Sequence, residues 1–177
     1  MSNSAGDFLW LIRSGRARTR GELQQYTGLS RSTVAQRLER LLDAGYVLEP
    51  GNDGSTGGRP AMLLEFNHRH GVVLVADLGA AHARLALVDL AGRPLAEQLT
   101  ELHIADGPEP VLDWVGERFA ALLAEAGYGP NDVRGIGIGV PGPVEFETGM
   151  VHQPPIMTGW DAYPIVDHLR KKFDVPV

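Results

Sequence analysis

The chain has 177 residues, of which 44% are hydrophobic and 21% are charged, and it contains no cysteine. This composition is typical of a folded globular protein with one domain, or with one small and one medium domain. The lack of cysteine excludes disulfide bonds and thiolate metal sites. The apolar stretch from Phe8 to Ile12 is too short for a signal peptide, and Asp77 and Arg84 interrupt the longer run from Val72 to Val88. A cytoplasmic protein without a membrane span is therefore expected.

The net charge of −6 conceals two oppositely charged parts of the chain. Residues 1–60 carry eight Arg against six Asp and Glu, whereas residues 61–177 carry eight basic and sixteen acidic residues. Seven of the arginines fall between Arg13 and Arg40. Such an asymmetry suggests a module that binds a polyanion, joined to a second part with a different role. The alternative is that these charged residues only form a surface that water solvates.

The first third of the sequence predicts three helices. The apolar residues from Phe8 to Ile12 favour a first helix that ends near Gly15. The segment "TRGE" has the form of a capping box, in which Thr19 accepts from the amide of Glu22 and the Glu22 carboxylate reaches back to the amide of Thr19. Ser30 can cap a third helix. The apolar positions of that helix have the spacing of one buried face: Val34, Leu38, Leu41 and Leu42.

The opposite side of the third helix is polar and rich in arginine. Its residues are Arg31, Ser32, Thr33, Gln36, Arg37 and Arg40. Hydroxyl, amide and guanidinium groups bond to phosphates and base edges, as a recognition helix does in the major groove. These residues are therefore the candidate DNA contacts.

Residues 46–67 give two strand-like runs around a glycine-rich loop, which is the form of a β wing. Arg59 lies near the tip, where a guanidinium would suit a narrow minor groove; the alternative is a solvated turn. Three helices and a wing predict a winged helix-turn-helix domain over residues 1–67. A winged helix that serves only protein contacts is the alternative to DNA binding.

Residues 68–177 predict a mixed sheet covered by helices. Strands are expected at 72–78, 83–89, 93–103 and in "VRGIGIGV", with helices at 108–126 and 163–173. The order βββαβα is that of one lobe of the actin-like ATPase and sugar-kinase fold, which is ribonuclease H-like. The fold class is thus α+β followed by α/β. The segment "GIGIGV" is not a dinucleotide fingerprint, because no G-x-x-G turn opens a helix after it.

Several motifs together resemble the ROK family (repressors, open reading frames and kinases). They are "TRGELQQYTGLSRSTVAQRLERLLDAGYV" with "GGRP" in the first part, and "DLGAAHAR", "GIGVPGPV" and "PPIMTGW" in the second. The resemblance covers nearly the whole chain. It implies a transcriptional regulator that binds double-stranded operator DNA as a homodimer and responds to a sugar or sugar phosphate.

The sequence departs from the kinases of this family at the phosphate loop. Ala80 and Ala81 stand where kinase members carry Gly and Thr, so the loop has an added Cβ and lacks a hydroxyl. Asp77 and Gly79 are therefore expected to be remnants of a phosphate site. Asp77 could still organise Mg²⁺ through water, but a carboxylate that caps the turn is the favoured interpretation.

The chain ends at "KKFDVPV", before the Asn-Asp pair that supplies the general base in the family. Phosphoryl transfer needs groups placed around the whole phosphate. We therefore expect a truncated lobe with no catalytic residue, no cofactor and no metal site, and a DNA-binding regulator rather than an enzyme. The alternatives are a fragment of a sugar kinase and an inert remnant.

Overall fold

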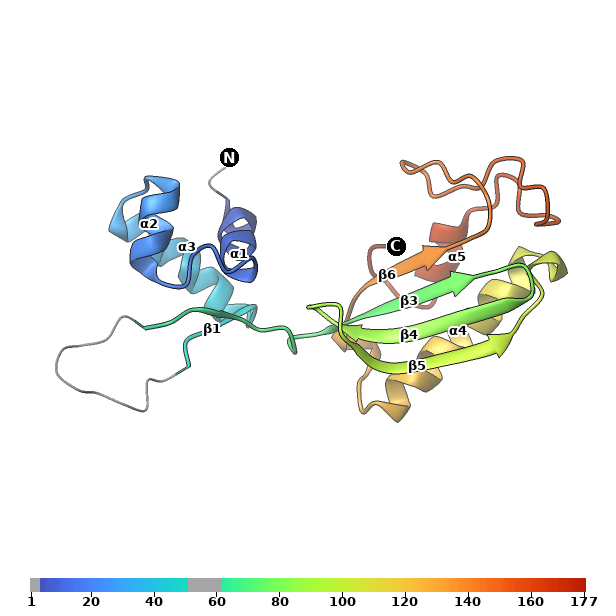
Figure 1. Ribbon diagram of the computed structural model, residues 1–177, viewed down its shortest axis with the longest axis horizontal. Helices are drawn as coiled ribbons and strands as arrows, with labels where there is room; N and C mark the ends of the chain where they lie inside the picture. Colours follow the sequence, from blue (N-terminus) through green and yellow to red (C-terminus); the bar gives the residue numbers. More distant parts are fainter. Residues whose placement is uncertain (1–3, 51–61) are drawn as a thin grey trace. The chain divides into compact units, whose positions relative to one another are not determined.

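The computed structural model describes residues 4–50 and 62–177, which form two compact units divided between His70 and Gly71. The first unit is built from helices and a short two-stranded sheet, and the second from a mixed sheet with helices (Figure 1). The chain is therefore a mixed α/β protein. No helix within the described ranges is long and apolar enough to cross a lipid bilayer.

The helices of the first unit are α1 (Ala5–Arg13), α2 (Arg20–Thr27) and α3 (Arg31–Asp43), and each begins after a capping side chain. Ser4, Thr19 and Ser30 accept hydrogen bonds from the amide three residues further on, which satisfies an amide that the helix leaves free. The expected capping box differs in one detail. The Glu22 carboxylate accepts from the amide of Arg18, one residue before Thr19, so it ties the preceding turn to α2.

The core of the first unit lies between the three helices and the short sheet. Strands β1 (Val47–Leu48) and β2 (Glu65–Phe66) pair antiparallel. Apolar side chains of the three helices, of β1 and of the residue before β2 are buried together: Phe8, Leu11, Ile12, Leu23, Val34, Leu38, Leu41, Val47 and Leu64. Leu42, which the helical spacing also places on this face, is only half-buried. The buried side of α3 fixes which of its residues face outward.

The second unit has a four-stranded sheet in the order β5-β4-β3-β6. The strands are β3 (Val72–Leu78), β4 (His82–Asp89), β5 (Pro94–Glu101) and β6 (Val133–Gly139). β3 pairs antiparallel with β4 and parallel with β6, and β4 pairs antiparallel with β5. Alternate residues of β3 are buried, as the period of two in a strand requires.

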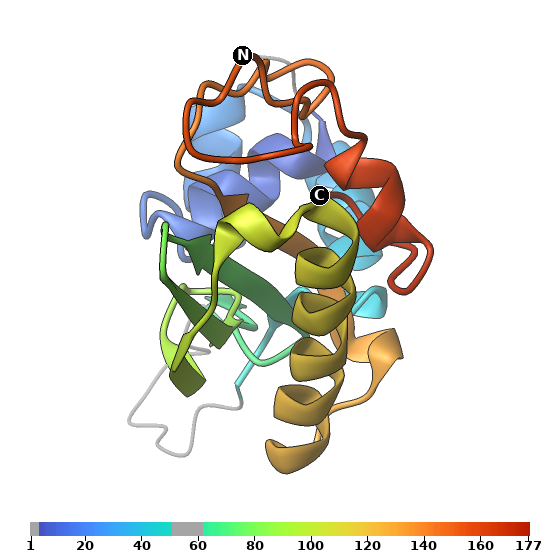
Figure 2. The same ribbon diagram turned by 90° about the vertical axis from the view of Figure 1, so that its right-hand side faces the viewer.

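Helix α4 (Pro108–Glu125) covers one face of this sheet and contacts β4 and α5 (Figure 2). Its residues Val111, Val115, Phe119 and Leu122 are buried, as their spacing predicts. The irregular segment after β6 is anchored by Trp160, which is fully buried and donates its indole N–H to the carbonyl of Ile104 at 2.9 Å. This segment leads into the last helix.

The last helix, α5, is shorter than the sequence pattern indicates. It spans Ile165–Arg170, whereas the pattern predicts a helix over 163–173. Pro164 is the N-terminal cap, and its missing N–H and fixed φ favour a helix start and not a helix interior. Beyond α5, Phe173 still packs into the core from a non-helical position. Burial in this segment therefore follows the tertiary fold and not a continuous helix.

Candidate nucleic-acid interface

The outward face of α3 carries the polar residues that the sequence singles out. Val34, Leu38 and Leu41 are buried, so the residues on the opposite side of the helix face solvent. Ser32, Gln36 and Arg40 are all exposed and follow one another at intervals of four residues, which places them on one face. This face presents a hydroxyl, an amide and a guanidinium along three successive turns.

Three hydroxyl groups meet at the N-terminus of α3. The Ser30 hydroxyl accepts from the amide of Thr33 at 3.2 Å, and it lies 3.0 Å from the Ser32 hydroxyl and 2.9 Å from the Thr33 hydroxyl. These bonds fix the positions of the Ser32 and Thr33 side chains before any ligand arrives. A hydroxyl both donates and accepts, so each retains capacity for a further hydrogen bond.

The arginines of α3 fall into two classes. Arg31 and Arg40 are exposed and make no hydrogen bond, ion pair or ring contact within the part of the chain that the structure describes. Arg37 is half-buried, and its guanidinium carbon lies 5.9 Å from the centroid of the Phe8 ring in α1. The sequence places all three on the polar side, but only Arg31 and Arg40 have guanidinium groups without a partner among the described residues.

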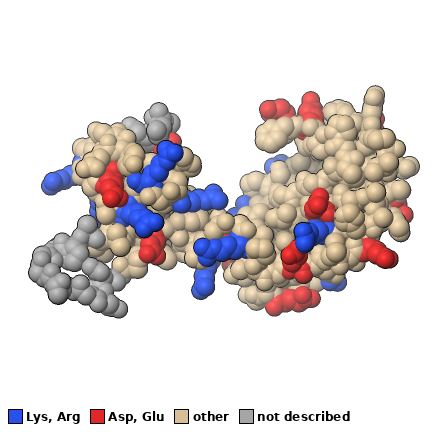
Figure 3. Space-filling view, viewed as in Figure 1, with Lys and Arg blue, Asp and Glu red and all other residues tan. Residues whose placement is uncertain are grey.

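Other arginines of this unit are held by neighbouring side chains. Arg16 lies over the ring of Trp10 at 4.6 Å, and Arg20 pairs with Glu49 at 2.6 Å. Arg13 lies over Phe66 in the short sheet. Basic side chains nevertheless predominate on the face of this unit that Figure 3 shows. The surface of this unit is therefore mainly basic, and some of its arginines are held in place by neighbouring side chains.

Arg59, the arginine expected at the wing tip, lies outside the described residues. The structure describes the two short strands at the base of that loop, β1 and β2. Leu64 is buried beside them, and its amide donates to the carbonyl of Arg18 at 2.7 Å. The base of the loop is thus tied to the segment that precedes α2.

Asp77 lies near the end of β3, opposite Arg84 of β4, and Gly79 lies in the turn that follows. The Gly79 amide donates to the carbonyl of His82 at 2.8 Å, so the turn satisfies this donor itself. The His82 ring also fills the space that a Cβ on Gly79 would occupy. The expectation that Asp77 caps the turn is wrong. Its carboxylate is exposed near the end of β3 and makes no hydrogen bond within the described residues, and the backbone of the turn closes without it.

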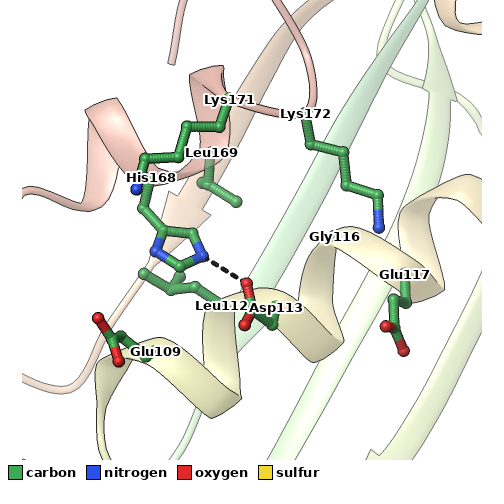
Figure 4. A pocket seen from close by; sticks show the side chains of 9 residues that line it. All are labelled: Glu109, Leu112, Asp113, Gly116, Glu117, His168, Leu169, Lys171 and Lys172. Carbon is green, nitrogen blue, oxygen red and sulfur yellow. Dashed lines mark hydrogen bonds and ion pairs between the residues drawn. The ribbon is translucent and has the colours of Figure 1, made fainter.

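A groove in the second unit was not found from the sequence. It lies between α4 and α5, has a volume of about 500 Å³, and has acidic Glu109 and Glu117 on one wall and Lys171 and Lys172 on the other (Figure 4). His168 of α5 bonds across the groove to the Asp113 carboxylate of α4 at 2.9 Å (Figure 4). Its other ring nitrogen lies 2.9 Å from the Tyr163 hydroxyl. Burial raises the pKa of Tyr163 above its ordinary value, and the nearby charges of Glu109 and Asp113 add to this.

The spacing of Tyr163 and His168 offered no signal for this network, because Asp113 lies far from both in sequence. Within the described parts of the chain, no cluster of three metal-ligating side chains is present. The surface of α3 is therefore the candidate site with the better-defined chemistry.

The chain is similar in sequence to curated proteins that are named as repressors. The chain is 30% identical over 159 residues to the xylose repressor of Caldicellulosiruptor bescii, and 29% identical over 159 residues to the xylose repressor of Bacillus subtilis. Each match covers 90% of this chain, and 40% and 41% of the respective relatives. The chain thus spans about two fifths of the length of these relatives.

Among solved structures, a ROK family transcriptional regulator described as a homologue of the E. coli MLC protein superposes with a TM-score of 0.79 at 26% identity. The superposition covers 98% of this chain and 43% of that one. The model of the ROK family itself matches residues 73–177. Since this match includes more than half of the chain, the protein belongs to the ROK family.

Proposed function

We propose that this chain is the DNA-binding portion of a ROK-type transcriptional regulator. The observation that carries the proposal is the outer face of α3, where Ser32, Gln36 and Arg40 project from a helix whose other side is buried. An α-helix with such groups fits the major groove, where guanidinium and amide groups bond to guanine and adenine edges. The relatives named as repressors support this function.

The three-helix unit acts as a winged helix-turn-helix in this proposal. Helix α3 is the recognition helix, with Arg31, Ser32, Thr33, Gln36 and Arg40 as its contacts to DNA. Arg59 contributes from the wing, where it enters a narrow minor groove. Double-stranded operator DNA is the partner, and two copies of the chain bind two half-sites of a palindrome. A sugar or a sugar phosphate serves as the effector.

We further propose that the second unit has no kinase activity. The backbone of the β3–β4 turn uses its own Gly79 donor, and His82 occupies the space beside it. The Cβ of Ala80 limits how closely the backbone can approach a phosphate. Ala81 has no hydroxyl that could bond to one. The unit then serves the regulator as a scaffold and not as an enzyme.

The proposal is tested by selecting duplexes from a randomised library with the purified chain and then measuring affinity across a salt series. Arg31→Ala should weaken binding by about 1–3 kcal/mol and relax specificity at one base pair. Arg93→Ala is the matched control, because it removes an exposed arginine from the second unit. Equal affinity of wild type, R31A and R93A for the selected duplex would overturn the assignment of α3.

The wing is tested separately with selected duplexes that differ only in their flanks. Arg59→Ala should weaken binding most where the flanks are rich in A·T pairs, because their minor groove is narrow and strongly negative. An equal loss on all flanks would show that Arg59 contacts only phosphate. If the wild-type chain selects no duplex at all, the regulator function is wrong and an inert remnant becomes the better interpretation.

A further inference from the structure

Arg37 occupies a different environment from the other arginines of α3. It follows Val34 by three residues and precedes Leu38 and Leu41, which are buried, so it stands at the edge of the buried stripe. Its guanidinium carbon lies 5.9 Å from the centroid of the Phe8 ring, and Phe8 is fully buried in the core. The side chain therefore extends toward α1.

The guanidinium of Arg37 is also partly removed from water. Its Nη1 atom is buried and has no hydrogen-bond partner within the residues described. A buried donor without an acceptor costs free energy, so other interactions must hold the group in place. The face of the Phe8 ring attracts a cation. Attraction to the carboxylate of Asp7 is a second contribution.

Asp7 is itself fixed at the start of α1. Its carboxylate accepts from the backbone amide of Ser4 at 2.7 Å and from the Ser4 hydroxyl at 2.6 Å. These hydrogen bonds hold the pKa of Asp7 below its ordinary value, and the charge of Arg37 contributes a smaller part of the same effect. Arg37 thus contacts the buried Phe8 ring of α1, and the fixed Asp7 carboxylate of the same helix attracts its charge.

We infer that Arg37 is a positioning residue that fixes α3 against α1 and does not read bases. The inference rests on the proposed DNA binding, and it narrows the set of base-reading residues to those on the outer face of α3. A rotation of α3 about its own axis would turn Gln36 and Arg40 together, because both are rigidly attached to the helix. The packing of Arg37 on Phe8 opposes that rotation.

The experiment compares Arg37→Leu with Arg37→Ala in the full chain. Leucine keeps apolar contact with the Phe8 ring and removes the donor that lacks an acceptor, whereas alanine leaves the space beside the ring empty. Arg40→Ala is the matched control, since it removes an exposed arginine one turn further along the same helix. Affinity for the duplex selected by the wild-type chain is measured against log salt, together with amide hydrogen exchange in α1.

We expect Arg37→Leu to keep its affinity for DNA within about threefold of wild type. The slope of log affinity against log salt concentration (the salt slope) and the rate of amide hydrogen exchange in α1 should both stay unchanged. Arg37→Ala should lose about tenfold in affinity at the same salt slope, and α1 amides should exchange faster. Arg40→Ala should weaken binding, because it removes a proposed DNA contact, and it should leave α1 exchange unchanged.

The inference is overturned if Arg37→Leu and Arg37→Ala both reduce the salt slope and leave α1 exchange as in wild type, because the guanidinium would then contact DNA directly without fixing α1. It is also overturned if α1 exchange is the same in Arg37→Ala and wild type. The measurement of hydrogen exchange in α1 needs no DNA. Failure of the wild-type chain to bind any duplex would therefore refute the proposed function separately from the role of Arg37 in fixing α1.

Discussion

The backbone amide of Gly79 donates to the carbonyl of His82 at 2.8 Å, and the imidazole ring of His82 fills the space beside the α-carbon of Gly79. A phosphate loop needs free amides and open space at this position. In this chain one amide is already bonded and the space is occupied. The turn therefore has the properties of a closed hairpin between β3 and β4.

We predict that the chain does not bind Mg-ATP with micromolar affinity, with or without glucose. The reason is the combination of the bonded Gly79 amide with Ala80 and Ala81 in the turn. Isothermal titration calorimetry measures the binding, and a coupled assay measures turnover. A sugar kinase titrated in the same buffer is the positive control. Saturable micromolar binding, or turnover above the buffer blank, would show that the turn opens for phosphate.

Replacing Ser30 with alanine should destabilise the first unit by about 1 kcal/mol, the usual cost of removing a serine cap. The Ser30 hydroxyl accepts from the amide of Thr33 and bonds to two further hydroxyls. Hydrogen exchange of the α3 amides measures the change. Ser32→Ala is the control and should stay within about 0.5 kcal/mol, because its exposed hydroxyl caps no amide. Equal losses in the two variants would contradict the capping role.

Trp160→Phe should destabilise the second unit by about 2–4 kcal/mol. The substitution removes the indole N–H that bonds to the carbonyl of Ile104 and leaves a cavity at a side chain with no exposed surface. Urea unfolding followed by circular dichroism measures the loss. Trp10→Phe provides the comparison. Because Trp10 is 47% exposed, its substitution should lower the free energy of unfolding by less. A smaller loss for Trp160→Phe than for Trp10→Phe would refute the anchoring role.

Tyr163→Phe should lower stability by about 1 kcal/mol near pH 8, because it removes the hydroxyl that bonds to His168. Burial raises the pKa of Tyr163 above 10.0, its ordinary value. The folded state thus favours the neutral phenol. Its contribution is complete below pH 10 and is lost as the pH rises through the higher pKa of the folded state.

The stability of wild type should accordingly fall above pH 10 more steeply than that of Tyr163→Phe. Urea unfolding between neutral pH and pH 11 measures both curves. Tyr26→Phe is the control, because Tyr26 is 55% exposed. If the curves of wild type and Tyr163→Phe run parallel through this range, the Tyr163 phenol has no part in the alkaline loss of stability.

Much of the fold can be predicted from short stretches of the sequence. The serine and threonine caps before α2 and α3 and the apolar spacing within α3 and α4 mark elements that the structure contains. These signals act between residues three to eight positions apart, so they are visible without knowledge of the tertiary fold. The same local reading made α5 too long at both ends, because the apolar spacing extends beyond the helix that begins after Pro164 and ends at Arg170.

The sequence by itself determined the polar face of α3, the altered turn after β3 and the resemblance to the ROK family. Only the tertiary structure decided which groups on those elements are free. It placed Arg37 over Phe8, His82 beside Gly79, and Asp113 against His168. The first and last of these contacts join residues far apart in the chain, and the other depends on how a turn folds back. Spacing in the sequence reports the face of a helix, but packing sets where a side chain points and which partners it meets.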